Sequence, residues 1–279
     1  MNEQSLKDRL RLIAQEKKMQ FNACWKQLLL ERFLIRLTHS SYKNRFIFKG
    51  GFLLGQIIKI GRETIDLDFL VARIKAEEAV LQPIFEEIAH IDLKDGFVFD
   101  LDNTESLSQP HMEYSGLRMN LNAKFMRMKD KIHIDVGVGD VVEPKMKEIR
   151  LLSLREQPLF EKSISLLAYP VESILAEKLE TVLSKGAGNS RMKDYHDLVL
   201  LLRTKNLLNL GKLKVSINET FTNRKTIIRS VKFKADELFT LQRLWSSHLK
   251  GLGNMAEELK LPITIEEVIE EINGVMAIF

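Results

Sequence analysis

The sequence is poor in cysteine and in long apolar runs. Cys24 is the only cysteine among 279 residues, which excludes an intramolecular disulfide and suits a reducing compartment. No apolar run approaches the length needed to span a bilayer. The first residues, MNEQSLKDRLRLIAQEKK, lack the apolar stretch of a signal peptide. We therefore expect a cytoplasmic protein without a membrane partner.

Metal-binding histidine patterns, internal repeats and low-complexity segments are missing as well. The six histidines show no H-E-x-x-H or other zinc-ligand spacing, which excludes a zinc enzyme of that kind. Hydrophobic residues make up 45% and charged residues 29% of the chain, which is typical of a soluble globular protein. The length suits one large domain or two medium ones.

Charge is nearly balanced over the whole chain but not along it. The formal net charge is +4, while residues 185–234 contain 12 basic and three acidic side chains, a surplus of +9. Residues 1–45 carry a surplus of +6, and residues 256–279 have a net charge of −5. On charge counts alone, solvated helix faces are the favoured interpretation. The alternative is a basic surface that attracts a phosphate-rich partner such as RNA.

Hydrophobic periodicity divides the chain into a mixed α/β part and a helical part. The first part is expected to contain, in chain order, helices over 3–40, a strand at 46–48, a helix-length segment at 52–60, a strand at 64–71, a helix at 75–90, a strand at 97–101, and alternating segments at 113–125 and 131–138. In the second part, helical patterns cover residues 170–184, the stretch to 202, 237–249 and 265–278. A glycine-rich turn at 186–188 follows the first of these helices.

A strand that ends in two glycines is the first candidate functional feature. Gly50 and Gly51 follow the apolar strand, and paired glycines let the backbone approach a ligand closely and turn sharply into a helix. The next strand carries Asp66 and Asp68. Because side chains two apart on a strand point the same way, these acids share one face with Thr64.

Two neighbouring carboxylates need a counter-charge. Unit charges about 4 Å apart repel by about 4 kcal/mol at an effective dielectric constant of about 20, so such a pair either raises a pKa or recruits a cation. Oxygen ligands alone suit Mg²⁺ or Mn²⁺ rather than zinc. Solvated acids on an edge strand are the alternative explanation of a D-x-D pair.

A third acid lies in a later strand. In residues 131–138 the β-branched side chains share one face, which leaves Asp135 on the other face with His133. An acid paired with a Lys or Arg at a strand end is the alternative. Three carboxylates on two strands, downstream of a glycine turn, are typical of a two-metal phosphoryl-transfer site.

These motifs together resemble the nucleotidyltransferase superfamily and, more narrowly, the abortive-infection AbiEii-type nucleotidyltransferase toxins. The resemblance rests on motifs spread in order over residues 49–198: Lys49-Gly50-Gly51, Arg62-x-Thr64-x-Asp66-Leu67-Asp68, Asp135-x-Gly137-x-Gly139-Asp140, Tyr169-Pro170-Val171-Glu172, Glu177-Lys178-Leu179 and Arg191-x-Lys193-Asp194-x-x-Asp197-Leu198. It implies an α/β (α+β) fold with a nucleotidyltransferase-like mixed β-sheet core flanked by helices and a helical C-terminal half. The implied domains are residues 1–168, the N-terminal helices plus this core, and residues 169–279, a helical domain that completes the cleft.

The resemblance also implies roles for single residues. Asp66, Asp68 and Asp135 would hold Mg²⁺ or Mn²⁺, and Asp135 would help to deprotonate an RNA 3′ hydroxyl. Lys178 falls within an apolar helix stripe, where snorkelling to solvent is the alternative, and would bind the triphosphate with Asp194 beside it. The other nucleotide-binding candidates are Lys49, Gly50, Gly51, Arg62, Thr64, Arg191 and Asp197.

Several of these candidates have an ordinary structural alternative. Pairing with a nearby acid explains Arg62 as well as a triphosphate contact does. Acids in the first turn of a helix, such as Asp194 and Asp197, complement the helix dipole. One position departs from the family pattern: Phe52 follows the glycines, where the superfamily usually has Ser and many relatives have Thr. A hydroxyl that could contact the triphosphate is therefore missing, although backbone N–H groups of the turn could still bind phosphate.

By the same resemblance, the chain is expected to be the toxin of a toxin–antitoxin or phage abortive-infection system, with an antitoxin protein encoded nearby. It would transfer NMP from an NTP to an RNA 3′ end, with tRNA as the expected acceptor, and so block translation. One alternative is a transferase that modifies a small molecule such as an aminoglycoside. Another is a non-catalytic nucleotide- or protein-binding module. The basic stretch at 185–234 favours RNA, because an aminoglycoside is itself cationic.

Overall fold

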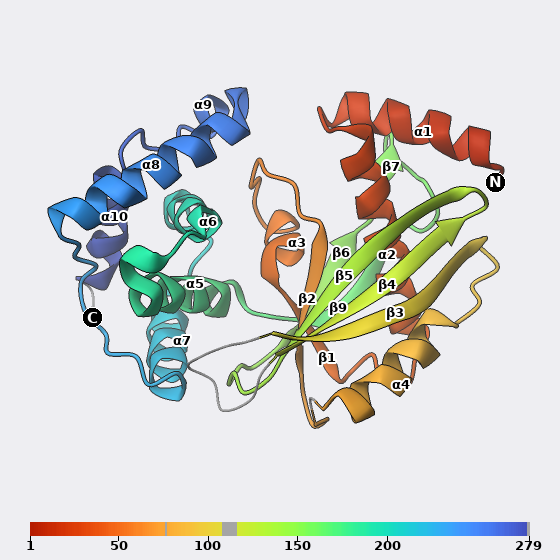
Figure 1. The fold of residues 1–279 in the computed structure, drawn as a ribbon, viewed down its shortest axis with the longest axis horizontal. Coiled ribbons are helices and arrows are strands. Elements are labelled where there is room, and N and C mark those ends of the chain that lie inside the picture. Colours follow the sequence, from red (N-terminus) through yellow and green to blue (C-terminus); the bar gives the residue numbers. More distant parts are fainter. Residues whose placement is uncertain (76, 108–115, 278–279) are drawn as a thin grey trace. The chain divides into compact units, whose positions relative to one another are not determined.

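The computed structural model describes residues 1–75, 77–107 and 116–277, and the chain forms two compact units (Figure 1). The first comprises Met1–Gln56, Glu63–Asp140 and Pro144–Tyr169, and the second comprises Ile57–Arg62, Val141–Glu143 and Pro170–Phe279. The chain passes from the first unit to the second for the last time between Tyr169 and Pro170, next to the predicted domain boundary after residue 168. The two short segments at 57–62 and 141–143, which belong to the second unit, were not predicted.

A mixed sheet forms the centre of the first unit, as predicted, and it has seven strands in the order β3-β4-β5-β2-β1-β9-β6. β2 runs parallel to β5 and β1 runs parallel to β9, and the other neighbours are antiparallel. The bounds are β1 Phe46–Lys49, β2 Asp66–Val71, β3 Phe97–Leu107, β4 Gly116–Phe125, β5 Met128–Gly137, β6 Lys145–Arg150 and β9 Ser163–Ala168. A separate hairpin consists of β7 (Ser153–Leu154) and β8 (Gln157–Pro158).

Four helices accompany this sheet: α1 (Glu3–Glu16), α2 (Phe21–His39), α3 (Gly50–Gly55) and α4 (Glu78–Ala89). α2 and α4 pack against each other and against strands of the sheet (Figure 1). The face they cover is apolar because of the strict alternation along the strands: Leu67, Phe69, Ile134 and Val136 are all buried. The side chains between them therefore point to the opposite face, where the candidate acids lie.

The second unit is helical, as predicted. Its elements are α5 Val171–Lys185, the short helix η1 Gly186–Gly188, α6 Met192–Arg203, α7 Leu210–Asn223, α8 Ala235–Leu252, α9 Asn254–Glu258 and α10 Ile265–Met276. α5 packs against α6 and α7, while α10 packs against α6 and α8. The Trp245 indole is buried and donates to the Pro262 carbonyl at 2.9 Å. Among the described residues, no helix is long and apolar enough to cross a membrane.

Three sequence predictions need correction. The helix predicted over 52–60 ends at Gly55, and residues 56–58 form a turn and a bend; of the three isoleucines beyond the helix, Ile60 is buried, with 6% of it exposed. The strand predicted from Thr64 begins at Asp66. Helix α7 and strands β6, β7, β8 and β9 were not predicted. Residues 113–115 of the predicted alternating segment, residue 76 and residue 278 lie outside the described residues.

Candidate active site

The glycine turn lies directly against one of the predicted acids. Gly50 begins α3 with φ +75°, a conformation that side chains rarely adopt. A Cβ atom at Gly50 would lie 1.9 Å from Oδ2 of Asp68, which sits opposite Lys49 on the neighbouring strand. Phe52 points away into the core, where it is 4% exposed and packs against Phe48. The turn therefore needs glycine for its own backbone and for the carboxylate beside it.

Charged side chains from five strands form one row across the sheet. The strand register places Lys49 opposite Asp68, Asp68 beside Asp135, Asp135 opposite Arg118, and Arg118 opposite Glu105. We call these five residues the polar row. Adjacent strands lie about 4.8 Å apart, so consecutive members are near neighbours on one face. Asp66 lies two residues along β2 from Asp68 and so points to the same face.

Arg118 holds the third acid. Its Nε and Nη2 donate to the two carboxylate oxygens of Asp135 at 2.7 and 2.8 Å. These hydrogen bonds raise the pKa of Arg118 against the opposing effect of burial, and the charges of Asp135, Asp66 and Glu105 act in the same direction. A bidentate guanidinium fixes a carboxylate in one orientation. Arg118 therefore positions Asp135. Pairing with an arginine is the alternative that the sequence analysis left open for this acid.

His133 lies beside Asp66 in a defined tautomer. It is the register partner of Asp66 in β5, and its Nδ1 lies 2.5 Å from Asn120 Oδ1. The Asn120 amide donates to Asn103 and Glu105 at 2.6 and 2.8 Å, so its oxygen is the acceptor and His133 Nδ1 carries the proton.

The donor set of Asp66 and Asp68 fits Mg²⁺. Both are half-buried carboxylates on one face of β2, and Mg²⁺ is commonly bound by one or two carboxylates together with substrate phosphates rather than by a complete protein cage. The described part of the chain contains no cluster of three or more His, Cys, Asp or Glu side chains able to hold a metal by themselves. Both oxygens of Asp135 accept from Arg118, which positions this third acid.

Lys49 interacts with residues near the end of the first unit. Its Nζ lies 3.2 Å from Asp140 Oδ2 and 4.9 Å from the centre of the Tyr169 ring. Tyr169 Oη in turn donates to the same Asp140 oxygen at 3.3 Å. Asp140 and Tyr169 are part of the family motifs but were not predicted as site residues.

A second charged cluster lies within the second unit. Lys178 Nζ contacts Asp194 Oδ1 at 3.0 Å and Asp197 Oδ2 at 2.7 Å. Arg62 donates to both oxygens of Asp197 at 3.0 and 2.7 Å, and Arg191 contacts Asp194 at 2.9 Å. Both acids are fully buried. We call these five residues the buried cluster.

Burial and charge act in opposite directions in this cluster. Burial raises the pKa of Asp197, but Lys178 and Arg62 outweigh it and bring the pKa to about 2. Burial likewise lowers the pKa of Lys178, but Asp197 and Asp194 raise it above its ordinary value. Asp197 and Lys178 therefore both stay ionised at neutral pH.

Two histidines fasten the segment that carries Arg62. His196 Nε2 lies 2.8 Å from the carbonyl oxygen of Ile60, and its Nδ1 lies 2.9 Å from Nε2 of His248. Because a carbonyl only accepts, Nε2 of His196 is the donor, and Nδ1 accepts from His248. Burial lowers the pKa of His196 to about 4 and also lowers that of His248. The neutral pair thus holds residues 57–62 against α6 and α8.

The structure groups the predicted residues by unit. Lys49, Gly50, Gly51, Thr64, Asp66, Asp68 and Asp135 belong to the first unit, whereas Arg62, Lys178, Arg191, Asp194 and Asp197 belong to the second. Thr64 precedes β2 and is half-buried. The sequence argument missed Arg118, whose signal was its place on the polar face of an alternating strand.

Comparison with known proteins gives one family over most of the chain. The family model "Nucleotidyl transferase AbiEii toxin, Type IV TA system" matches residues 32–271. A comparison with curated proteins gives no match. Similar solved structures include JHP933 from Helicobacter pylori, at 14% identity and a TM-score of 0.48 over 92% of this chain and 91% of that chain. A putative nucleotidyltransferase from H. pylori is 14% identical, with a TM-score of 0.48 over 93% of this chain and 95% of that chain. An antigenic nucleotidyltransferase-like protein from Paracoccidioides brasiliensis is 14% identical, with a TM-score of 0.39 over 87% of this chain and 96% of that chain.

Proposed function

The chain belongs to the AbiEii nucleotidyltransferase toxin family of type IV toxin–antitoxin systems, and we propose that it transfers a nucleoside monophosphate from an NTP to the 3′ end of an RNA in a Mg²⁺-dependent reaction. The acceptor we propose is tRNA, whose modification would block translation. A cognate antitoxin is the protein partner that such a toxin needs.

The observation that carries the proposal is the arrangement of Asp66, Asp68 and Asp135. The three acids share one face of the sheet, and Asp68 lies against the turn at Gly50. A sheet face with oxygen donors next to a close-approach glycine suits a substrate that brings its own phosphates and a divalent cation. Acidic pairs without these neighbours would be ordinary surface residues.

The reaction assigns a task to each group. Asp66 and Asp68 would hold Mg²⁺, which when bound would neutralise the triphosphate and favour departure of pyrophosphate. The RNA 3′ oxygen forms a bond to the α-phosphorus, and the bond from that phosphorus to the oxygen bridging the β-phosphorus breaks. Asp135, held by Arg118, would accept the hydroxyl proton as this happens.

RNA suits the surface of the second unit better than a cationic small molecule does. Some basic residues between 185 and 234 are paired with acids, as Arg224 is with Glu177 and Glu180. Eleven basic residues of this stretch are exposed, and some of these are also paired with acids: Lys185, Arg191, Lys193, Arg203, Lys205, Lys212, Lys214, Lys225, Arg229, Lys232 and Lys234. Exposed lysines and arginines neutralise phosphates and release counterions, whereas they repel an aminoglycoside.

The test is transfer of label from each α-labelled NTP, with Mg²⁺, to total tRNA and in parallel to an aminoglycoside. The proposal predicts label on tRNA with the wild type and no label with the Asp66→Ala variant. The circular dichroism spectrum of the variant should match that of the wild type, which shows that it is folded. Label on the aminoglycoside alone would contradict tRNA as the acceptor. A fully active Asp66→Ala variant would contradict the assigned site.

A further inference from the structure

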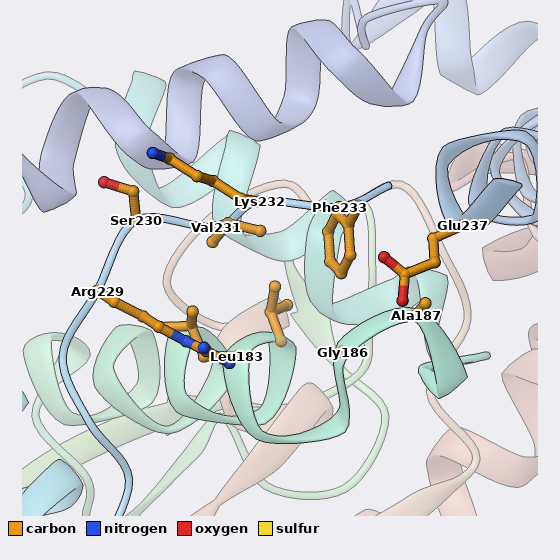
Figure 2. Close-up of a pocket in the computed structure, with 10 residues that line it drawn as sticks. Leu183, Gly186, Ala187, Arg229, Ser230, Val231, Lys232, Phe233 and Glu237 are labelled. Atoms are coloured by element: carbon orange, nitrogen blue, oxygen red, sulfur yellow. The ribbon is translucent and has the colours of Figure 1, made fainter. Parts of the chain in front are cut away.

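The second unit contains a cavity of about 350 Å³ that the reaction above does not use (Figure 2). It lies where the extended segment 229–233 passes the end of α5. Its lining residues are Val182, Leu183, Gly186, Ala187, Arg229, Ser230, Val231, Lys232, Phe233 and Glu237. No residue of the polar row or the buried cluster is among them. A volume of this size matches a small-molecule subsite rather than a packing defect.

The middle of the cavity is apolar and contains one aromatic ring. Val182, Leu183 and Val231 are buried, and Figure 2 shows the ring of Phe233 pointing from its extended segment into the cavity. Gly186 leaves one corner open: it has φ +53°, and no atom lies within 4 Å of the place where its Cβ would be. A planar ligand can therefore enter beside the Phe233 ring.

Opposite charges lie at the two ends of this apolar middle. In Figure 2 the Arg229 side chain extends towards Leu183, while the carboxylate of Glu237 points towards Ala187. The Lys232 side chain points away from the cavity in the same view. Glu237 Oε2 accepts from the backbone N–H of Lys234 at 2.7 Å, which closes the capping box of α8 and fixes the carboxylate. Its Oε1 remains available as an acceptor.

We propose that this cavity binds one unstacked nucleotide of the RNA acceptor, with its base against Phe233, its N–H donors on Glu237 and its phosphate at Arg229. Each part follows from chemistry: bases stack on aromatic rings, carboxylates accept from the amino group of cytosine, and arginine binds phosphate. The surrounding basic stretch of +9 favours a nucleotide within a strand over a free mononucleotide. The proposal deepens the proposed function and rests on it for the identity of the ligand.

Fluorescence anisotropy with short labelled oligo(C) RNA, and with an abasic strand of equal phosphate number, tests the base contact. Phe233→Ala should weaken oligo(C) binding about tenfold and leave binding of the abasic strand unchanged, and Phe233→Trp should retain affinity. The matched control is Phe239→Ala, because Phe239 lies on α8 and is 68% exposed. Equal affinity of folded Phe233→Ala and wild type for oligo(C) would overturn the proposal.

Two further variants test the charged ends. Glu237→Gln keeps a side chain that can close the capping box and should reduce the preference for oligo(C) over oligo(U). Arg229→Gln should weaken oligo(C) binding more than Lys225→Gln, which removes an equal charge outside the cavity. An unchanged base preference together with equal effects of the two charge losses would overturn the assignment.

Competition with free CMP separates a strand from a mononucleotide. Weak competition by CMP would support a nucleotide within an RNA strand as the ligand. CMP that binds as tightly as oligo(C) would overturn that assignment. These readouts do not depend on nucleotide transfer. Transfer without a Phe233 effect would refute the cavity proposal alone, and a Phe233 effect without transfer would refute the proposed function alone.

Discussion

The carboxylate of Asp68 occupies the space that a side chain at Gly50 would need. A Cβ atom there would meet Oδ2 of Asp68 at 1.9 Å, and the φ of +75° at Gly50 already disfavours any side chain. This relationship links the glycine motif and the D-x-D motif, which are 18 positions apart from Gly50 to Asp68, into one structural element.

Replacement of this glycine should therefore damage both the fold and the site. Gly50→Ala is expected to lower the free energy of unfolding by more than about 1 kcal/mol and to abolish transfer, because Asp68 must move. Urea denaturation and the transfer assay check the two effects. Gly251→Ala is the control: it lies in α8 with no atom within 4 Å of an added Cβ, so it should be neutral or slightly stabilising. Similar losses in both variants would contradict the account.

The buried cluster should depend on charge and not only on shape. Asp197→Asn leaves Lys178 and Arg62 without their shared carboxylate and should cost about 3–5 kcal/mol of unfolding free energy. Glu271→Gln breaks an exposed pair with Arg203, whose side chains are 30% and 39% exposed, and should cost less than about 1 kcal/mol. Urea denaturation of both variants makes the comparison. A small loss for Asp197→Asn would show that the cluster does not hold the unit together.

The His196 pair predicts a loss of stability on acidification. His196 has a pKa of about 4 in the folded state and about 6.5 when unfolded, so the unfolded state binds the proton first. The contribution of neutral His196 to the free energy of unfolding is complete above pH of about 6.5 and is lost as the pH falls towards 4. At pH of about 5 the loss is about 2 kcal/mol. Burial raises the pKa of Glu31 to about 7, which acts with the opposite sign.

The informative quantity is consequently the difference between wild type and His196→Gln, because Glu31 is common to both. We expect the stability advantage of the wild type, measured by urea denaturation at neutral and acidic pH, to shrink as the pH falls. A difference that stays constant with pH would show that His196 is not held neutral.

Arg118 should act on transfer through Asp135. Arg118→Ala frees the carboxylate to rotate and should lower kcat about 100-fold, while NTP binding measured by titration calorimetry changes little. Arg118→Lys should rescue only part of the rate, because an ammonium cannot make the bidentate contact. Full activity of Arg118→Ala would show that Asp135 needs no fixed orientation.

The sequence predicted what depends on local pattern. Alternation in residues 131–138 placed Asp135 on the polar face, and the spacing of Asp66 and Asp68 placed them together. It could not predict that Arg118 faces Asp135, because that contact depends on the register between two strands. It also misjudged residues 56–60, which form a turn and a bend before the buried Ile60, whose carbonyl oxygen contacts His196. An apolar run does not itself distinguish a helix from a buried extended segment.

The intact mass of purified tRNA after incubation with protein, mixed NTPs and Mg²⁺ tests the central claim most directly. The account predicts a mass increase by whole nucleoside monophosphate residues, which is absent with a chelator and with Asp66→Asn. An unchanged tRNA mass with folded wild-type protein, or an equal increase with Asp66→Asn, would contradict it.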